Sequence, residues 1–162
     1  MATGKLLATC LAIALAGATL PAQAEPTIVH SDGALAQLKA NRGVTLQWIS
    51  WDYRGKLDVA DDHGLIHLSG GQTSRDGKAT LTIDGVVTEI EAKSFRFHGR
   101  IEYFAPGIVS YNCVRDGDLT FKITGKRKFW RMQEMTADCG TEEPDVPNTI
   151  PTYNTDYVDI YF

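Results

Sequence analysis

The sequence lacks the short motifs that mark common enzyme classes, and it has few cysteines. It contains no G-x-S-x-G nucleophile elbow, no phosphate-binding loop and no dinucleotide-binding fingerprint. Only 3 of its 162 residues are cysteines, and no two of them have the C-x-x-C spacing of a redox pair. Because a site assembled from distant strands leaves no local motif, these absences favour a non-catalytic protein without excluding an enzyme.

Long hydrophobic runs are also missing. The longest covers residues 6–20, which is shorter than the roughly 20 residues of a membrane-spanning helix. Lys5 precedes this run and an A-x-A sequence follows it at 22–24, so all three parts of a secretory signal are present. We therefore expect residues 1–24 to be a cleaved signal peptide. The remaining residues 25–162 then form a single periplasmic or secreted domain without a membrane span.

Positive charge is not in excess. The chain has 16 Lys and Arg against 20 Asp and Glu, a formal net charge of −4. This balance gives no reason to expect nucleic acid as a partner, and the expected compartment argues against it as well. Nothing in the sequence points to a bound cofactor.

The cysteines predict one covalent cross-link. Cys113 and Cys139 are the two that remain beyond the expected signal peptide. An even pair in an oxidising compartment is typical of a structural bridge. We therefore predict a disulfide between Cys113 and Cys139.

Helical periodicity is confined to one short segment near the N-terminus. In SDGALAQLKANRG, at 31–43, either Ser31 or Asp32 can provide an N-cap, and Leu35 and Leu38 form one apolar edge. Gly43 is suited to the left-handed turn that often follows a helix. Beyond this segment the hydrophobic pattern alternates with the period of a β-strand.

Three Asp-Gly pairs separate the strand-like runs, at 76–77, 84–85 and 116–117. Asp-Gly readily adopts a type I′ turn, whose twist matches two antiparallel strands, so each pair predicts a hairpin. Runs such as VTLQWISW at 44–51 and SFRFHGRIEYF at 94–104 bring the count to about eight strands. We predict a mainly β domain with one short N-terminal helix, built as a small antiparallel meander barrel or a strongly curled sheet.

The segment DYVDIYF at 156–162 predicts the strand that closes this sheet. Val158, Ile160 and Phe162 fall on one side of such a strand and are expected in the core. Pairing of this segment with an open edge would also remove an aggregation-prone strand.

The same three residues resemble the terminal pattern of bacterial outer-membrane barrels, which gives an alternative. A spanning strand needs about 9–11 residues. The runs KATLTI at 78–83 and VVTEIEA at 86–92 are shorter than this. The sequence therefore favours a domain outside the membrane.

A metal site is suggested by the segment DDHGLIH. If it is one extended strand, Asp61, His63 and His67 share a face. The two histidines are then about 13 Å apart at 3.3 Å per residue, too far for one ion, so Asp61 and His63 are the candidate ligands. The alternative is a solvated turn followed by a polar strand face.

A cationic segment, GKRKFWR at 125–131, suggests an anion-binding surface. Arg127, Lys128 and Arg131 alternate with aromatic residues there, as in sites for anionic polymers. The alternative is that these cations pair with acids on neighbouring strands, such as Asp156 or Asp159.

A third candidate is aromatic. Trp48, Trp51 and Tyr53 lie close together in WISWDYRG and would line an apolar cavity, unless they are ordinary core residues.

These observations predict an exported, non-catalytic domain that binds a small apolar or amphipathic molecule, or an envelope component, inside the barrel or at its mouth. One alternative is a structural or interaction protein of the envelope without a pocket. Another is a small metal-dependent enzyme that uses Asp61, His63 and His67.

Overall fold

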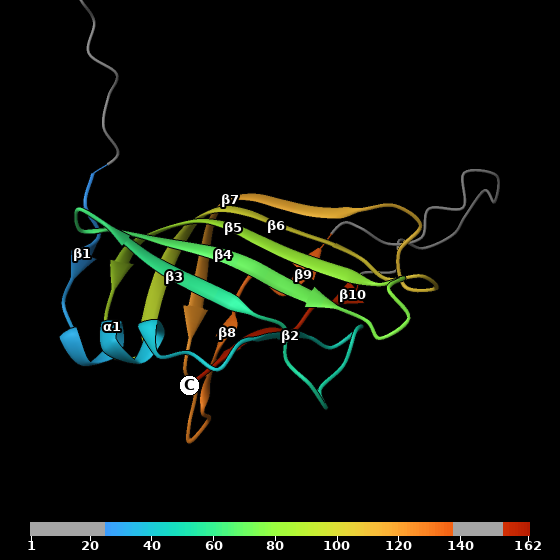
Figure 1. Cartoon of the computed structure of the whole chain (residues 1–162), viewed down its shortest axis with the longest axis horizontal. Helices are drawn as coiled ribbons and strands as arrows, with labels where there is room; N and C mark the ends of the chain where they lie inside the picture. The colour runs from blue at the N-terminus through green and yellow to red at the C-terminus, as the bar shows by residue number, and fades with distance from the viewer. Residues whose placement is uncertain (1–24, 138–153) are drawn as a thin grey trace, which may run out of the picture.

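The computed structural model describes residues 25–137 and 154–162, whose main sheet curls into a nearly closed barrel and is accompanied by a small two-stranded antiparallel sheet of β9 and β10 (Figure 1). In chain order the elements are β1 Ile28–Val29, α1 Asp32–Lys39, β2 Val44–Leu46, β3 Leu57–Asp62, β4 Leu65–Thr73, β5 Thr80–Ile90, β6 Ser94–Phe104, β7 Cys113–Lys122, β8 Phe129–Met132, β9 Thr136–Ala137, β10 Asn154–Thr155 and β11 Val158–Tyr161. The strand order across the main sheet is β2-β11-β8-β7-β6-β5-β4-β3, with β1 paired in parallel to β5. The predicted mainly β, barrel-like fold with one short helix is confirmed.

Two predictions concern residues outside these described segments. The signal peptide at 1–24 is one of them. The disulfide is the other, because Cys139 lies outside the described residues while Cys113 is fully buried at the start of β7. Both stay predictions. Within the described segments, no helix has the length and apolar character needed to cross a membrane.

The helix begins as the sequence predicts. The Ser31 hydroxyl accepts a hydrogen bond from the backbone N–H of Ala34 at 3.2 Å, which caps the first turn of α1. Ala34 and Leu38 are its buried residues, and Leu35 packs beside them. The helix ends at Lys39, and Gly43, with φ of 99°, shapes the following loop instead of the helix end.

The C-terminal segment closes the sheet, as predicted. Strand β11 lies between β8 and β2 and pairs antiparallel with both. Val158 and Ile160 are fully buried, and the ring of Phe162 packs edge-on against Trp130 with 4.5 Å between their centroids. The last gap, between β2 and β3, is bridged by hydrogen bonds of 3.0 and 2.8 Å between Val44 and Gly55.

The strand predicted over 44–51 is wrong in length. β2 ends at Leu46, whose carbonyl accepts hydrogen bonds from the N–H groups of Ile49 and Ser50. These bonds turn the chain so that Gly55 returns to pair with Val44. The apolar residues of 48–51 therefore belong to a connection between strands.

Only one of the three Asp-Gly predictions is confirmed. Asp76-Gly77 lies in the turn between β4 and β5, whereas Asp84-Gly85 lies inside β5 and Asp116-Gly117 inside β7. The reason is a row of glycines: Gly85 pairs with Gly99, and Gly99 pairs with Gly117. A Cβ atom added at Gly85 would lie 2.6 Å from Cζ of Phe97, so the ring occupies space that only glycine leaves open.

Because two of the predicted turns are absent, strands β5 and β7 are longer than the sequence predicts. β5 and β6 each have 11 residues and β7 has 10, so the argument that the strands are too short for a membrane barrel is wrong. The outward face of β6 is polar: Arg96, His98 and Arg100 are all exposed on it.

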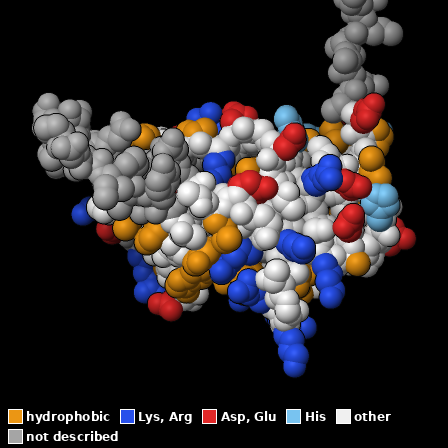
Figure 2. Space-filling view, turned by 180° about the vertical axis from the view of Figure 1, so that it is seen from behind, with side chains coloured by type: hydrophobic (Ala, Val, Ile, Leu, Met, Phe, Trp, Pro, Cys, Tyr) orange, Lys and Arg blue, Asp and Glu red, His pale blue; other side chains and the backbone are white. Residues whose placement is uncertain are grey.

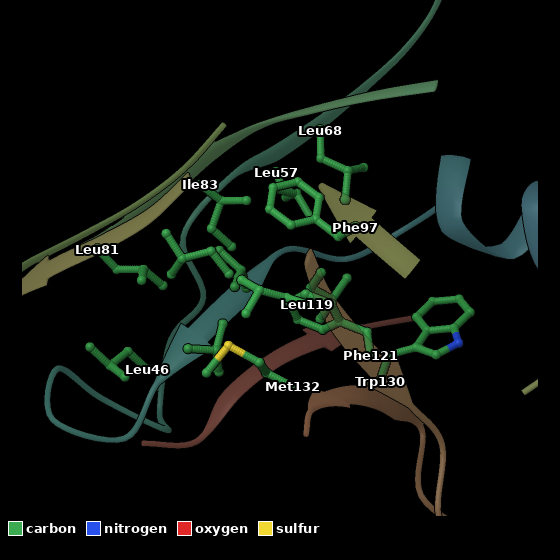
Figure 3. Close-up of a cluster of buried hydrophobic side chains, with 14 of the residues drawn as sticks. Leu46, Leu57, Leu68, Leu81, Ile83, Phe97, Leu119, Phe121, Trp130 and Met132 are labelled. Carbon is green, nitrogen blue, oxygen red and sulfur yellow. The ribbon is translucent and has the colours of Figure 1, made fainter. Parts of the chain in front are cut away.

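Apolar side chains fill the interior of the sheet. Figure 3 shows side chains from β2 through β8 pointing toward one another. Phe95 and Phe121 stack with 4.9 Å between centroids, and Phe97 and Trp130 meet this pair edge-on. The barrel interior is therefore a packed core, and the candidate sites must be sought on its surface.

Candidate functional site

A hollowed, charged surface lies where the barrel closes. The loop after α1 meets the connection between β2 and β3, and Gly43 faces the backbone of Gly55 so closely that a side chain at Gly43 would clash. Asn41 holds the first loop in place. Its side-chain amide donates to the carbonyls of Leu38 and Leu57 at 3.1 and 3.0 Å, and its oxygen accepts from the Gly43 N–H at 2.9 Å.

Two adjacent hollows flank this closure, with volumes of about 500 and 490 Å³. Both are lined by Arg42 and Arg54, so together they form one continuous depression. We call it the basic groove, and its charged lining residues are Lys39, Arg42, Arg54, Lys56, Lys128 and Asp58. Five cations and one acid thus meet on a chain whose overall charge is negative.

Three of these cations are available to a ligand. Lys39 pairs with Asp61 at 2.7 Å and Lys56 pairs with Asp58 at 2.8 Å. Among the described residues, no carboxylate lies within ion-pair distance of Arg42, Arg54 or Lys128. All three side chains belong to exposed residues. The groove therefore presents uncompensated positive charge.

Aromatic rings continue from the groove along β11 and β8. The guanidinium of Arg54 lies 4.1 Å from the ring centroid of Tyr161, and Tyr161 lies 5.2 Å from Phe129. Arg131 follows, 5.2 Å from Phe129, 4.0 Å from Tyr157 and 5.9 Å from Trp51. We call this series the aromatic–arginine strip; it consists of Trp51, Phe129, Arg131, Tyr157 and Tyr161.

Figure 2 is consistent with this arrangement. Seen from behind, hydrophobic and basic side chains lie next to one another on the lower half of the molecule. The hairpin between β7 and β8 projects below the barrel in Figure 1, and in Figure 2 the corresponding projection carries Lys or Arg side chains. Its cations are Lys126, Arg127 and Lys128.

Arg131 is held firmly in this strip. Its Nε and Nη2 atoms donate to the two carboxylate oxygens of Asp159 at 2.7 and 2.6 Å, and Asp159 is completely buried. Hydrogen bonding to Asp159 raises the pKa of the Arg131 guanidinium. Burial raises the pKa of the Asp159 carboxyl, an effect that the Arg131 contacts oppose. The alternative prediction, that Arg131 pairs with an acid such as Asp159, is confirmed.

The three predicted anion-binding residues have separate roles. Lys128 lines the basic groove, and Arg131 belongs to the strip. Arg127 donates to the Thr124 hydroxyl at 2.7 Å and lies 5.7 Å from the Phe129 ring. Sequence reasoning missed Arg42 and Arg54, because no local pattern sets them apart and only closure of the barrel brings them to Lys128.

The three predicted ligand-lining aromatics have different partners. The Trp48 indole N–H donates to Asp156 at 2.8 Å, and the Tyr53 hydroxyl donates to the Thr73 carbonyl at 3.1 Å. Trp51 remains 47% exposed. Among these three residues, only Trp51 belongs to the strip.

A buried polar cluster also escaped the sequence reasoning. Asp156 is completely buried; it forms an ion pair with Arg115 and accepts hydrogen bonds from Tyr103 at 2.8 Å and from Trp48. Burial raises the pKa of the Tyr103 phenol. Arg115 occupies an inward position of β7, and a cation among apolar inward residues was the available signal. Because the Asp156 carboxylate has three partners, we interpret the cluster as a hydrogen-bond network that stabilises the fold.

The metal prediction rested on an extended segment, and that premise is wrong. His63 and Gly64, with φ of 51° and 90°, form the turn between β3 and β4. Asp61 accepts from Lys39 at 2.7 Å and from the Gly64 N–H at 2.9 Å, and the Lys39 bond lowers the pKa of Asp61. His63 contacts Asp62 at 2.6 Å, while His67 lies on β4. Within residues 25–137 and 154–162, no three potential ligands are placed to share an ion.

Comparison with known proteins adds a family. The model of the PM1083 family matches residues 26–162. A relative from Pasteurella multocida (strain Pm70) is 31% identical over 118 residues, which cover 72% of this chain and 68% of the relative. Its printed name, "Uncharacterized protein PM1083", states no activity. No solved structure matches. The chain belongs to the PM1083 family.

Proposed function

We propose that this member of the PM1083 family is an exported, non-catalytic domain that binds an anionic component of the cell envelope in its basic groove. The observation that carries the proposal is the set of three cations, Arg42, Arg54 and Lys128, that line one depression without a carboxylate partner among the described residues. The sequence predicted a small apolar or amphipathic molecule, or an envelope component, bound inside the barrel or at its mouth. The apolar side chains that fill the interior favour the surface instead.

The chemistry of the groove suits an anion. Guanidinium groups present several N–H donors in a plane that matches carboxylate and phosphate oxygens, and Lys128 adds a mobile point charge. Stacking on Tyr161 restricts Arg54, so less side-chain entropy is lost when it binds.

Two features favour binding over catalysis. Neither hollow has a histidine or a cysteine among its lining residues, and the one lining carboxylate side chain, Asp58, pairs with Lys56. General acid–base chemistry needs a group that can exchange a proton near neutral pH. Arginine and an exposed lysine do not meet that need.

The outward face of β6 supports a domain surrounded by water. Arg96, His98 and Arg100 alternate there, whereas an outer-membrane barrel presents an apolar band to lipid. The core, by contrast, faces inward.

The proposal is tested by titrating the protein, expressed from its full-length sequence, with inorganic phosphate and with galacturonate while recording NMR spectra. Both anions should shift resonances of the groove. The double variant Arg42→Gln/Arg54→Gln should bind each anion at least about 10-fold more weakly, since two charge-assisted contacts are lost.

Arg75→Gln is the matched control, because Arg75 is also exposed and also lies over a tyrosine ring, 5.0 Å from the centroid of Tyr53, but outside the groove. It should bind like the wild type. Absence of binding by the wild type, or an equal loss in Arg75→Gln, would overturn the proposal and favour an envelope protein without a binding pocket.

A further inference from the structure

We infer that the ligand is an anionic oligosaccharide, with a carboxylate or phosphate in the basic groove and a sugar ring stacked on Trp51. This inference rests on the proposed function and names the ligand class for the same site. It combines the groove with the aromatic–arginine strip, which meet at Arg54 and Tyr161.

The first argument is the exposure of Trp51. Trp51 is 47% exposed, although it costs free energy to leave a tryptophan side chain in water. The guanidinium of Arg131 lies 5.9 Å from its ring, which orients the indole from one side. An exposed, oriented indole is a surface on which a sugar ring can stack.

The second argument is the hydrogen-bonding capacity beside that ring. Asp159 accepts from Nε and Nη2 of Arg131, and no described residue accepts a hydrogen bond from Nη1. A guanidinium held in this way can donate to a hydroxyl group without moving. The strip therefore provides an apolar face and a polar donor together, as a sugar requires.

The third argument is distance along the chain. Trp51 and Arg54 are three residues apart in the same connection, so their Cα atoms are at most about 11 Å apart. Because the two side chains start from neighbouring points of one connection, a ligand that uses both carries its negative charge close to a sugar ring. A short acidic oligosaccharide has this spacing, whether it is free or part of a lipid-linked polymer.

The test compares tetragalacturonate with galacturonate and with the neutral maltotetraose. The wild type should bind tetragalacturonate more tightly than galacturonate and maltotetraose more weakly than either. Trp51→Ala should weaken the binding of tetragalacturonate about 10-fold, a loss in the range of one aromatic contact and a larger factor than for galacturonate.

Tyr111→Ala is the matched control, because Tyr111 is 48% exposed and lies outside the strip. In the wild type, the indole N–H resonance of Trp51 should shift with tetragalacturonate, which gives a readout that needs no folded variant. Equal affinities for the tetramer and the monomer, or an unmoved Trp51 resonance, would overturn the inference. The proposed function would survive that result as long as galacturonate still bound the groove.

A lipid-linked source is distinguished by a separate arm. Lipopolysaccharide and its released, delipidated polysaccharide are compared at equal sugar concentration. Equal affinities for the two assign the binding to the glycan, as the inference requires. Binding of lipopolysaccharide alone would show that the lipid is recognised, and would overturn the inference.

Discussion

Arg131 of β8 and Asp159 of β11 form a two-point ion pair, with donor–acceptor distances of 2.7 and 2.6 Å, across two strands that close the barrel. Asp159 is completely buried, and Arg131 is largely covered by Tyr157, Phe129 and Trp51. The pair thus links the closing strand to the strip proposed as a ligand surface.

Removal of one partner from this pair should destabilise the protein strongly. Asp159→Asn leaves the Arg131 guanidinium without its counter-charge, so we expect the free energy of unfolding to fall by about 3 kcal/mol. Urea denaturation followed by circular dichroism measures it. Lys56→Gln breaks an exposed pair and serves as the control, with a much smaller loss expected. Equal losses in the two variants would contradict this account.

The Tyr103–Asp156 contact predicts a specific alkaline behaviour. Burial raises the pKa of Tyr103 above its ordinary value of 10.0, so the folded protein holds this proton more tightly than the unfolded chain does. The stabilisation is present below pH 10.0 and is lost progressively as the pH rises above that value. Thermal melts between pH 8 and 11 should show a steeper decline in the wild type than in Tyr103→Phe. Parallel declines would mean that Tyr103 is not the responsible group.

The paired glycines of β5 and β6, Gly85 and Gly99, leave no room for a side chain. Gly85→Ala places a Cβ atom 2.6 Å from Phe97 Cζ and 2.5 Å from the carbonyl oxygen of His98. We expect a loss of about 1–3 kcal/mol in the free energy of unfolding, as for other overpacked positions. Gly33→Ala is the control, because no atom lies closer than 4.0 Å to its added Cβ and the helix favours alanine. A neutral Gly85→Ala would show that the sheet can shift to make room.

The predicted disulfide remains to be measured. Mass spectrometry of the protein purified without reducing agent should find Cys113 and Cys139 without free thiols. Reduction should lower the free energy of unfolding by about 3 kcal/mol, because the bridge closes a loop of moderate length. Labelling of Cys113 or Cys139 by a thiol reagent in the unfolded, unreduced protein would refute the bridge.

Sequence reasoning identified the strands at 94–104 and at the C-terminus, but it placed two turns inside strands and divided β5 in two. Alternation at Phe95 and Phe97, and at Val158 and Ile160, is a local signal that survives folding because one side of each strand meets the core. The type I′ signal at Asp84-Gly85 is equally local, yet it failed. Pairing with Gly99 and the ring of Phe97 decided that position, and both lie more than ten residues away.

The candidate site was only partly predictable for a related reason. Lys128 and Arg131 stood out because they share a cationic segment with aromatic residues. The sequence neighbours of Arg42 and Arg54 form no recognisable motif, and the two arginines become part of a site only when Val44 pairs with Gly55. Asp159 was recognised as an acid on the closing strand, but its burial beside Arg131 depends on the register of β11 against β8.

The sequence by itself determined a mainly β chain with one capped helix and a final strand that closes the sheet, because hydrophobic alternation and helix capping act between residues a few positions apart. Only the tertiary structure decided which glycines turn the chain and which lie flat beneath Phe97. It also decided that five cations meet at the barrel closure. Those outcomes depend on contacts between strands, so they cannot be predicted from any single segment of the sequence.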